Sequence, residues 1–161
     1  MNNLYLMIGL PGSGKSTIAT KIGTELNIPV ISSDAIRKEL TGSEECFDKD
    51  TYIWNKVIPE RLKEALLEGD VIFDATNLSV RNRNKTRESL ELEHKCHAIY
   101  VNTPLGICIK RQNNRDRKVP TEVIKRMYKN MVLPTVEEKF DSFYTIKSAE
   151  DFLSNCLLRN W

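Results

Sequence analysis

The feature that most constrains this chain is a glycine-rich segment near its N-terminus. Residues 9–17 read Gly-Leu-Pro-Gly-Ser-Gly-Lys-Ser-Thr and fit the pattern G-x-x-x-x-G-K-[ST]. A continuous apolar run, Leu4 to Ile8, precedes the segment, and apolar residues at helical spacing follow it up to about Leu26. A loop between a buried strand and a helix can turn several backbone N–H groups toward one phosphate at the positive end of the helix dipole. The segment therefore predicts a nucleotide-binding loop.

The side chains of this loop predict its chemistry. We expect Lys15 to reach the β and γ phosphates of ATP and the Ser16 hydroxyl to ligate Mg²⁺. The alternative is a glycine-rich turn without a ligand, and the complete pattern between a strand and a helix argues against it. The predicted nucleotide-binding residues of the loop are Gly12, Ser13, Gly14, Lys15, Ser16 and Thr17.

The remaining chain alternates short β-type runs with longer helical ones, which is typical of a parallel sheet covered by helices. We expect Ser33 or Asp34 to cap the helix after the second strand, and Pro59 to kink or divide the helical pattern around it. With 161 residues and no evident linker, a single three-layer α/β/α domain over residues 1–161 is expected. The expected strands are 4–8, 29–31, 71–74, 97–101 and 143–146, and the later helices are 79–92, 104–114, 121–131 and 148–158.

Some classes of protein are disfavoured by what the sequence lacks. It contains no run of 18 apolar residues, and its N-terminus lacks the basic start of a secretory signal. The four cysteines form no C-x-x-C pair and are expected to be free, mostly buried thiols. We therefore expect a cytoplasmic protein that does not associate with membranes; its oligomeric state is left open.

The positive charges are concentrated in two stretches. The whole chain carries 24 basic and 22 acidic residues, a net charge of +2. Residues 81–87 contain four basic and no acidic residues, and residues 110–129 contain eight basic and two acidic ones. Either both stretches line an anionic site or both are solvated helix faces, and composition does not decide between these interpretations.

Two carboxylates are expected to converge on the glycine-rich loop. Asp34 follows the second expected strand and Asp74 ends the third, and loops beyond the carboxyl ends of parallel strands share one crevice. Asp34 could accept a proton from an attacking hydroxyl, hold the water shell of a metal ion, or only cap a helix. Arg37, one helical turn later, could hold an acceptor phosphate.

The residues around Asp74 and the second basic stretch favour transfer to a hydroxyl. Ala75 and Thr76 follow Asp74 where hydrolytic motors carry a second acid, and no Asn-Lys-x-Asp segment reads guanine. Residues 110–118 are interpreted as part of a lid, at about 110–120, that brings arginine to the transferring phosphoryl group. A solvated charge run is the alternative for this segment.

Four motifs together resemble the P-loop polynucleotide 5′-hydroxyl kinase family, in particular the kinase domain of the phage enzyme. The likeness covers nearly the whole chain and rests on the order and spacing of the motifs. They are Gly9 to Thr17, Ser33-Asp34-x-x-Arg37, Asp74 to Leu78, and Lys110-Arg111 through Arg115 to Val119-Pro120 with Met127-Tyr128-Lys129 beyond.

The resemblance implies a strand order 2-3-1-4-5 and a role for each matched residue. Lys15, Asp34 and Arg115 would be catalytic, with Asp34 as the general base and Arg115, beside Arg111, on the donor phosphates. Mg²⁺ would be held by Ser16, with Asp34 or Asp74 through water. On the acceptor side, Arg37 would hold a 3′ phosphate, Asp74 would orient Arg37 or the substrate, and Thr76 would line the site. We expect no phosphatase domain and therefore no healing of 3′ phosphates, and the lid is one residue shorter before Val119-Pro120 than in the phage enzyme.

Three functions remain open at this point. The first is transfer of the ATP γ-phosphate to a 5′-hydroxyl of RNA or DNA. The second keeps the chemistry but uses a small-molecule acceptor such as a nucleoside, sugar or antibiotic. The third is a nucleotide-binding regulatory module, which has no need of the base and lid arginine that this sequence carries. Residues 42–60 are expected to form a flap over the acceptor entrance.

Overall fold

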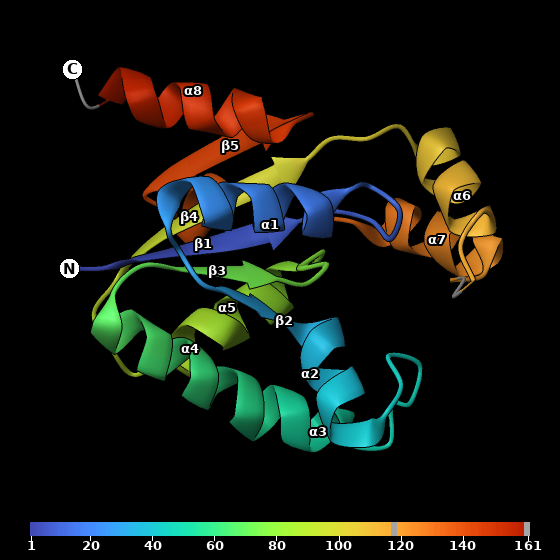
Figure 1. Cartoon of the computed structure of the whole chain (residues 1–161), viewed down its shortest axis with the longest axis horizontal. Coiled ribbons are helices and arrows are strands. Elements are labelled where there is room, and N and C mark those ends of the chain that lie inside the picture. The colour runs from blue at the N-terminus through green and yellow to red at the C-terminus, as the bar shows by residue number, and fades with distance from the viewer. Residues whose placement is uncertain (117–118, 160–161) are drawn as a thin grey trace.

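A five-stranded parallel sheet forms the centre of the fold (Figure 1). The computed structural model describes residues 1–116 and 119–159, with side chains up to residue 155. The strand order is β2-β3-β1-β4-β5, and every neighbouring pair is parallel. This confirms the expected fold class and strand order. The strands are β1 (Asn3–Ile8), β2 (Val30–Ser32), β3 (Val71–Asp74), β4 (Lys95–Val101) and β5 (Ser142–Ile146).

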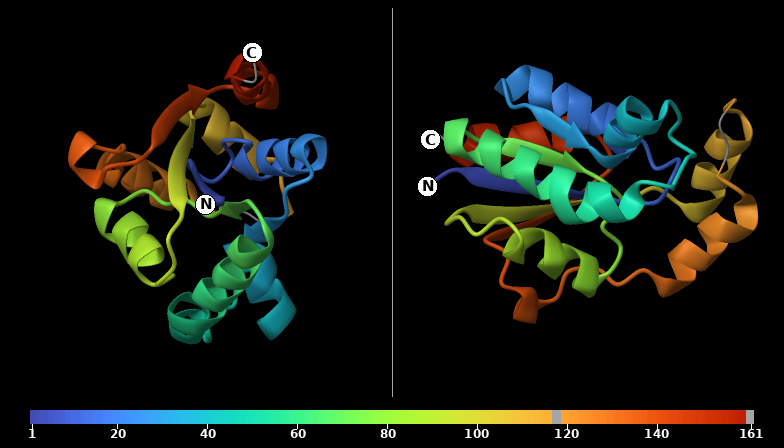
Figure 2. Two further views of the ribbon diagram at one scale, coloured as in Figure 1. Left: turned by 90° about the vertical axis from the view of Figure 1, so that its left-hand side faces the viewer. Right: turned by 90° about the horizontal axis from the view of Figure 1, so that it is seen from below.

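Helices cover both faces of the sheet and extend beyond one end of it. In Figures 1 and 2, α1 and α8 lie on one face, α4 and α5 on the other, and α6 and α7 beyond the carboxyl end of β1. The helices are α1 (Lys15–Leu26), α2 (Ser33–Thr41), α3 (Asp50–Tyr52), α4 (Ile58–Glu68), α5 (Val80–Glu88), α6 (Leu105–Asn113), α7 (Thr121–Asn130) and α8 (Ala149–Arg159), with a π-helical turn η1 (Ile53–Val57) and a 3-10 turn η2 (Val136–Glu138).

Alternating side chains of the central strands fill two cores, one on each face of the sheet. Leu4 and Leu6 of β1 belong to the core beneath α4 and α5, whereas Met7 belongs to the core beneath α1 and α8. Burying each such side chain contributes about 1.5–3 kcal/mol. The continuous apolar run of β1 is thus explained by burial on both faces, and the loops that follow the strands start from a rigid base.

The cap of α2 differs from the prediction. Ser32, the last residue of β2, is the N-cap, and its hydroxyl oxygen accepts a hydrogen bond from the Ala35 N–H at 3.2 Å. Ser32 can act as the N-cap because its backbone is still extended, and an N-cap residue has a non-helical backbone. The predicted caps Ser33 and Asp34 are therefore wrong, and Asp34 lies in the first turn of the helix.

The helical segment around Pro59 is divided, and the division takes the form of a π-helical turn just before the proline. The chain passes from α3 through the π-helical turn into α4, and the Ile58 N–H donates to the Ile53 carbonyl. Pro59 lies in the first turn of α4, and the helix before it has the wider π-helical form in place of regular α-helix. A different helix ends earlier than expected. The helix predicted over residues 79–92 is α5, which ends at Glu88.

The described residues bear on two further expectations. Within the ranges 1–116 and 119–159, no helix combines the length and apolar character needed to cross a membrane. Cys46, Cys96 and Cys108 are free, and the latter two are buried. Burial raises the pKa of the Cys96 thiol to about 12. The side chain of Cys156 lies outside the described residues.

Candidate active site

The glycine-rich loop joins β1 to α1 and takes a shape that two glycines permit. Gly12 and Gly14 have φ values of 83° and 89°, in the left-handed region that glycine adopts at little cost. A Cβ atom on Gly12 would lie 2.4 Å from the Cys108 carbonyl oxygen, so a side chain there would push α6 away. Gly14 is the N-cap of α1 and offers no side-chain cap, which leaves the first N–H groups of the helix suited to a phosphate.

Lys15 and Ser16 meet Asp74 beneath this loop. The Ser16 hydroxyl donates to Asp74 Oδ2 at 2.6 Å, and Lys15 Nζ lies 3.5 Å from Asp74 Oδ1. Asp74 is only 4% exposed, and its Oδ1 atom has no hydrogen-bond partner among the described residues. A hydroxyl beside a buried carboxylate oxygen with spare accepting capacity fits the hard oxygen ligands of Mg²⁺.

One cavity of about 1060 Å³ unites nearly all of the predicted site residues. It extends from the glycine-rich loop to α2 and to the loop that follows α2. Ser13 belongs to the glycine-rich loop but its side chain is buried and does not line the cavity. The predicted residues that line it are Gly12, Gly14, Lys15, Ser16, Thr17, Asp34, Arg37, Asp74, Thr76, Arg111 and Arg115.

The base of the predicted lid is attached to the glycine-rich loop. Arg111 on α6 directs Nη1 toward the Gly12 carbonyl oxygen at 3.4 Å, and Thr103 Oγ1 donates to the Ser13 carbonyl at 2.7 Å. Arg115 follows α6, is exposed and lines the cavity. Arg117 and Lys118 of the predicted lid lie outside the described residues. The described part of the lid therefore places two arginines on the loop side of the cavity.

Arg37 is held on the opposite side of the cavity by carboxylates. Nε and Nη2 of its guanidinium donate to the two Asp50 carboxylate oxygens at 2.8 and 2.9 Å. Nη1 donates to Asp34 Oδ1 at 2.7 Å. Asp74 was expected to orient Arg37 or the substrate. It pairs with Lys15 and Ser16, so of these two roles the one on Arg37 is not seen.

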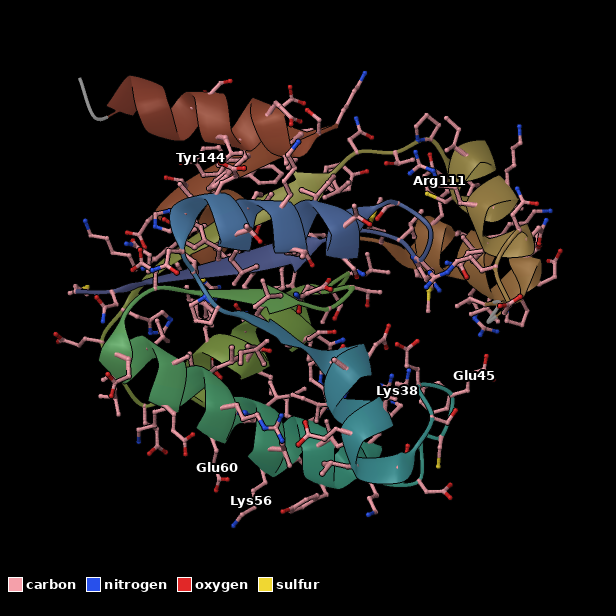
Figure 3. The ribbon with its side chains drawn as sticks, viewed as in Figure 1. Lys38, Glu45, Lys56, Glu60, Arg111 and Tyr144 are labelled. Carbon is pink, nitrogen blue, oxygen red and sulfur yellow. The ribbon has the colours of Figure 1, made fainter. Side chains whose placement is uncertain are left out.

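The loop between α2 and α3, residues 42–49, closes the cavity beside Arg37, and we call it the flap. Glu44, Glu45 and Phe47 of the flap line the cavity, as does Trp54 from the π-helical turn. Figure 3 shows Glu45 on the flap and Arg111 on α6, the two segments between which the cavity lies. Part of the predicted flap over residues 42–60 thus borders the same cavity as Asp34.

Comparison with known proteins agrees with this arrangement. A model of the AAA domain family AAA_33 matches residues 4–134. The chain belongs to this family. The AAA-domain chain is also similar to L-seryl-tRNA(Sec) kinase of Methanococcus maripaludis, with 31% identity over 148 residues that make up 86% of this chain and 56% of that protein. The chain thus spans little more than half the length of that relative.

Solved structures share the fold of the AAA-domain chain. A gluconokinase from Sinorhizobium meliloti 1021 superposes with a TM-score of 0.67 at 21% identity, covering 98% of this chain and 94% of that one. The Pnkp1/Rnl/Hen1 RNA repair complex gives a TM-score of 0.72 at 20% identity, covering 80% and 43%. The family match and the geometry of the glycine-rich loop identify the site as a P-loop nucleotide-binding site, and two of the similar proteins are named as kinases.

The first basic stretch of the AAA-domain chain does not line this site. Arg83 of α5 is fully buried and donates from Nε and Nη2 to the Glu138 carboxylate at 2.8 and 3.0 Å. Arg87 donates to the Glu138 carbonyl and stacks over the Phe140 ring at 4.1 Å. None of residues 81–87 is among the described residues that line the large cavity. The interpretation that both basic stretches line an anionic site is therefore wrong for residues 81–87.

Sequence reasoning also missed a residue that this site contains. Asp50 lies within the expected flap over residues 42–60 but was given no role, yet it accepts two hydrogen bonds from Arg37. Its one signal in the sequence is that it lies 13 residues after Arg37 in an acidic loop, which does not indicate a contact. The contact exists because the flap folds back across α2.

Proposed function

We propose that this kinase transfers the γ-phosphate of ATP to a hydroxyl group with Asp34 as the general base. The observation that carries the proposal is that Asp34 lines the same cavity as Lys15 and Ser16 of the glycine-rich loop. In the reaction the acceptor oxygen bonds to the γ-phosphorus, the bond to the bridging oxygen of ADP breaks, and the hydroxyl proton passes to Asp34. Holding the two reactants in line supplies much of the rate enhancement.

The donor half of the cavity is suited to ATP. Lys15 and the backbone N–H groups of the loop would bind the phosphates, while Arg111 and Arg115 would offset the charge that spreads over the transferring group. Ser16 and Asp74 are the residues that would hold Mg²⁺. An ion held there would supply positive charge that offsets the charge developing on the transferring phosphoryl group.

For the acceptor we propose a small hydroxylated molecule such as a nucleoside or sugar. The acceptor half of the cavity offers the rings of Phe47 and Trp54 beside Asp34, which suit a compact acceptor with an apolar face. The four basic residues of 81–87, which one interpretation of the sequence placed at an anionic site, lie outside this cavity. The name of the gluconokinase structure likewise refers to a small acceptor.

The 5′-hydroxyl end of a nucleic acid is the second candidate acceptor. It is favoured by the exposed basic residues of the second stretch, which could contact a phosphate backbone outside the cavity. The curated relative is named for a seryl group borne on tRNA. The exposed residues in question are Lys110, Lys125, Arg126 and Lys129.

An assay with γ-labelled ATP and Mg²⁺ tests these proposals across nucleosides, sugars, and RNA and DNA oligonucleotides with 5′-hydroxyl ends. We expect labelled product from a small acceptor, with a Michaelis constant that changes little with salt. A nucleic-acid acceptor would instead show a steep loss of affinity as salt rises. A Lys15→Met variant is the control and should lose transfer to every acceptor. ATP binding without labelled product from any hydroxyl would contradict the proposed function and favour a regulatory module.

A further inference from the structure

Arg37 satisfies its guanidinium almost entirely within the protein. Two N–H groups donate to Asp50, one to Asp34 Oδ1, and one to the Glu44 carbonyl oxygen at 3.3 Å. Four of the five N–H donors of the side chain are therefore used. The Phe47 ring covers the guanidinium, with its centroid 4.6 Å from Cζ. Little of Arg37 is left for a substrate, since the residue is only 5% exposed.

Asp50 occupies the place on Arg37 that an anionic ligand would take. Its two oxygens accept parallel hydrogen bonds from Nε and Nη2, and this paired geometry is the one by which arginine recognises either a carboxylate or a phosphate. The hydrogen bonding of Arg37 to the Asp50 carboxylate is also the main reason that the pKa of Arg37 is raised above its ordinary value. A phosphate could reach the same two N–H groups only by displacing Asp50.

Displacement of Asp50 is disfavoured by the surroundings of the pair. The Arg37 side chain is 7% exposed and that of Asp50 is 28% exposed, so the pair is largely removed from water. Separating a desolvated pair leaves two charges to be paired again, and the incoming phosphate must itself lose water. The flap would also have to move, because Phe47 and Glu44 bind Arg37 together with Asp50.

We propose that Asp50 determines acceptor specificity by taking the position of an acceptor phosphate on Arg37. The acceptor is then a compound with no phosphate next to the reacting hydroxyl, such as a free nucleoside or a sugar. Oligonucleotide 5′ ends and nucleoside 3′-phosphates would be poor acceptors. The proposal rests on the proposed function for its consequence in catalysis, but the state of Arg37 can be tested without catalysis.

The direct test follows the side-chain Nε–Hε NMR signal of Arg37 in protein loaded with ADP and Mg²⁺, so that the glycine-rich loop is occupied. The signal is assigned with Arg37→Lys, and inorganic phosphate is then added. We expect the signal of the wild-type protein to stay in place and that of Asp50→Asn to move. Asp48→Asn removes the same charge two residues earlier, on the flap, at an exposed residue that does not line the cavity, and should behave as wild type.

The wild-type arm can overturn the proposal by itself. If phosphate moves the Arg37 signal of wild-type protein as far as that of Asp50→Asn, Asp50 does not exclude it. If Asp50→Asn fails to fold, Asp50→Ser takes its place. An unmoved Arg37 signal in a folded Asp50 variant would also contradict the proposal, because removing the carboxylate should open the position.

A kinetic test compares a nucleoside with its own 3′-phosphate as acceptors. We expect wild-type kcat/KM to favour the nucleoside by at least about tenfold, since one charge-assisted interaction is worth that much. Asp50→Asn should reduce or invert this ratio, and Asp48→Asn should not. A wild-type preference for the 3′-phosphate would overturn the proposal. Absence of transfer to either acceptor would count against the proposed function, while the NMR result would still decide the state of Arg37.

Discussion

The two basic stretches of this chain are both rich in arginine, but their surroundings are opposite. Arg83 on α5 is fully buried and paired with Glu138, whose side chain is 2% exposed. Arg111 on α6 is exposed and contacts the glycine-rich loop only through a 3.4 Å approach to a carbonyl oxygen. The comparison teaches that a run of positive charge predicts an anionic partner, but not whether that partner is a ligand or a carboxylate of the same chain.

The contacts of Arg83 explain why α5 carries a buried arginine at this position. Its Nη1 atom also donates to the carbonyl oxygens of Asn77 and Val132, at 2.9 and 2.8 Å. Glu138 in turn accepts from the Thr135 N–H at 2.8 Å. Arg83 therefore ties the loop after β3 to the segment that returns from α7 to β5, which is a structural task away from the cavity.

Replacing Arg115 with alanine is expected to have the largest effect on catalysis. An arginine that stabilises a transferring phosphoryl group contributes about 10³- to 10⁵-fold to the rate. We expect a loss of this order in single-turnover transfer, with no change in thermal stability, because the side chain is exposed.

The matched control for Arg115→Ala is Lys125→Ala. Lys125 lies on α7, pairs with Glu122 at 3.7 Å, and is not among the described residues that line the cavity. Its replacement should leave transfer at the wild-type rate. Equal losses in the two variants would mean that net charge, rather than the position of Arg115, supports the reaction.

Arg83→Met is expected to produce the reverse pattern. Removing one partner of a buried ion pair leaves an unpaired charge and costs about 3–5 kcal/mol in the free energy of unfolding. Urea denaturation should show this loss, while ATP affinity at low temperature should be retained. The double variant Arg83→Met/Glu138→Leu should recover part of the stability, since no charge is left unpaired. A stable Arg83→Met protein with lost ATP binding would break the comparison.

A smaller effect is expected in the acid dependence of stability. Burial alone would raise the pKa of Glu138, but hydrogen bonds from Arg83 and Thr135 hold it below the ordinary value of 4.5. The carboxylate therefore stabilises the folded state above pH 4.5, and this contribution is lost as the pH falls through the lower folded-state pKa. Urea denaturation between neutral and acid pH should show a weaker acid dependence for Glu138→Gln than for wild type. Parallel curves would exclude this role.

Much of the fold could be predicted because its signals are local. Apolar runs such as Leu4 to Ile8 mark strands buried on both faces, and the glycine-rich loop fixes the first strand and helix. The N-cap of α2 was missed. Ser32, Ser33 and Asp34 are all residue types that cap helices well, and only the end of β2 selects among them. The strand order 2-3-1-4-5 was predicted from the resemblance to the polynucleotide kinase family, because no local sequence pattern specifies it.

The candidate site was predictable where residues follow strand ends, and unpredictable where distant segments meet. Lys15, Asp34 and Asp74 line one cavity because parallel strands end at the same edge of the sheet. Asp50 reaches Arg37 through the flap, and Glu138 reaches Arg83 across 55 residues. Neither pair has a sequence separation that would predict the contact.

The most direct test of the proposed chemistry is single-turnover phosphoryl transfer by Asp34→Asn, with the acceptor that the wild-type kinase uses fastest. Asparagine keeps the size of the side chain but cannot take up the hydroxyl proton. We predict that transfer slows by about 10²- to 10⁴-fold while ATP affinity is unchanged. Transfer at the wild-type rate would contradict the assignment of Asp34 as the base.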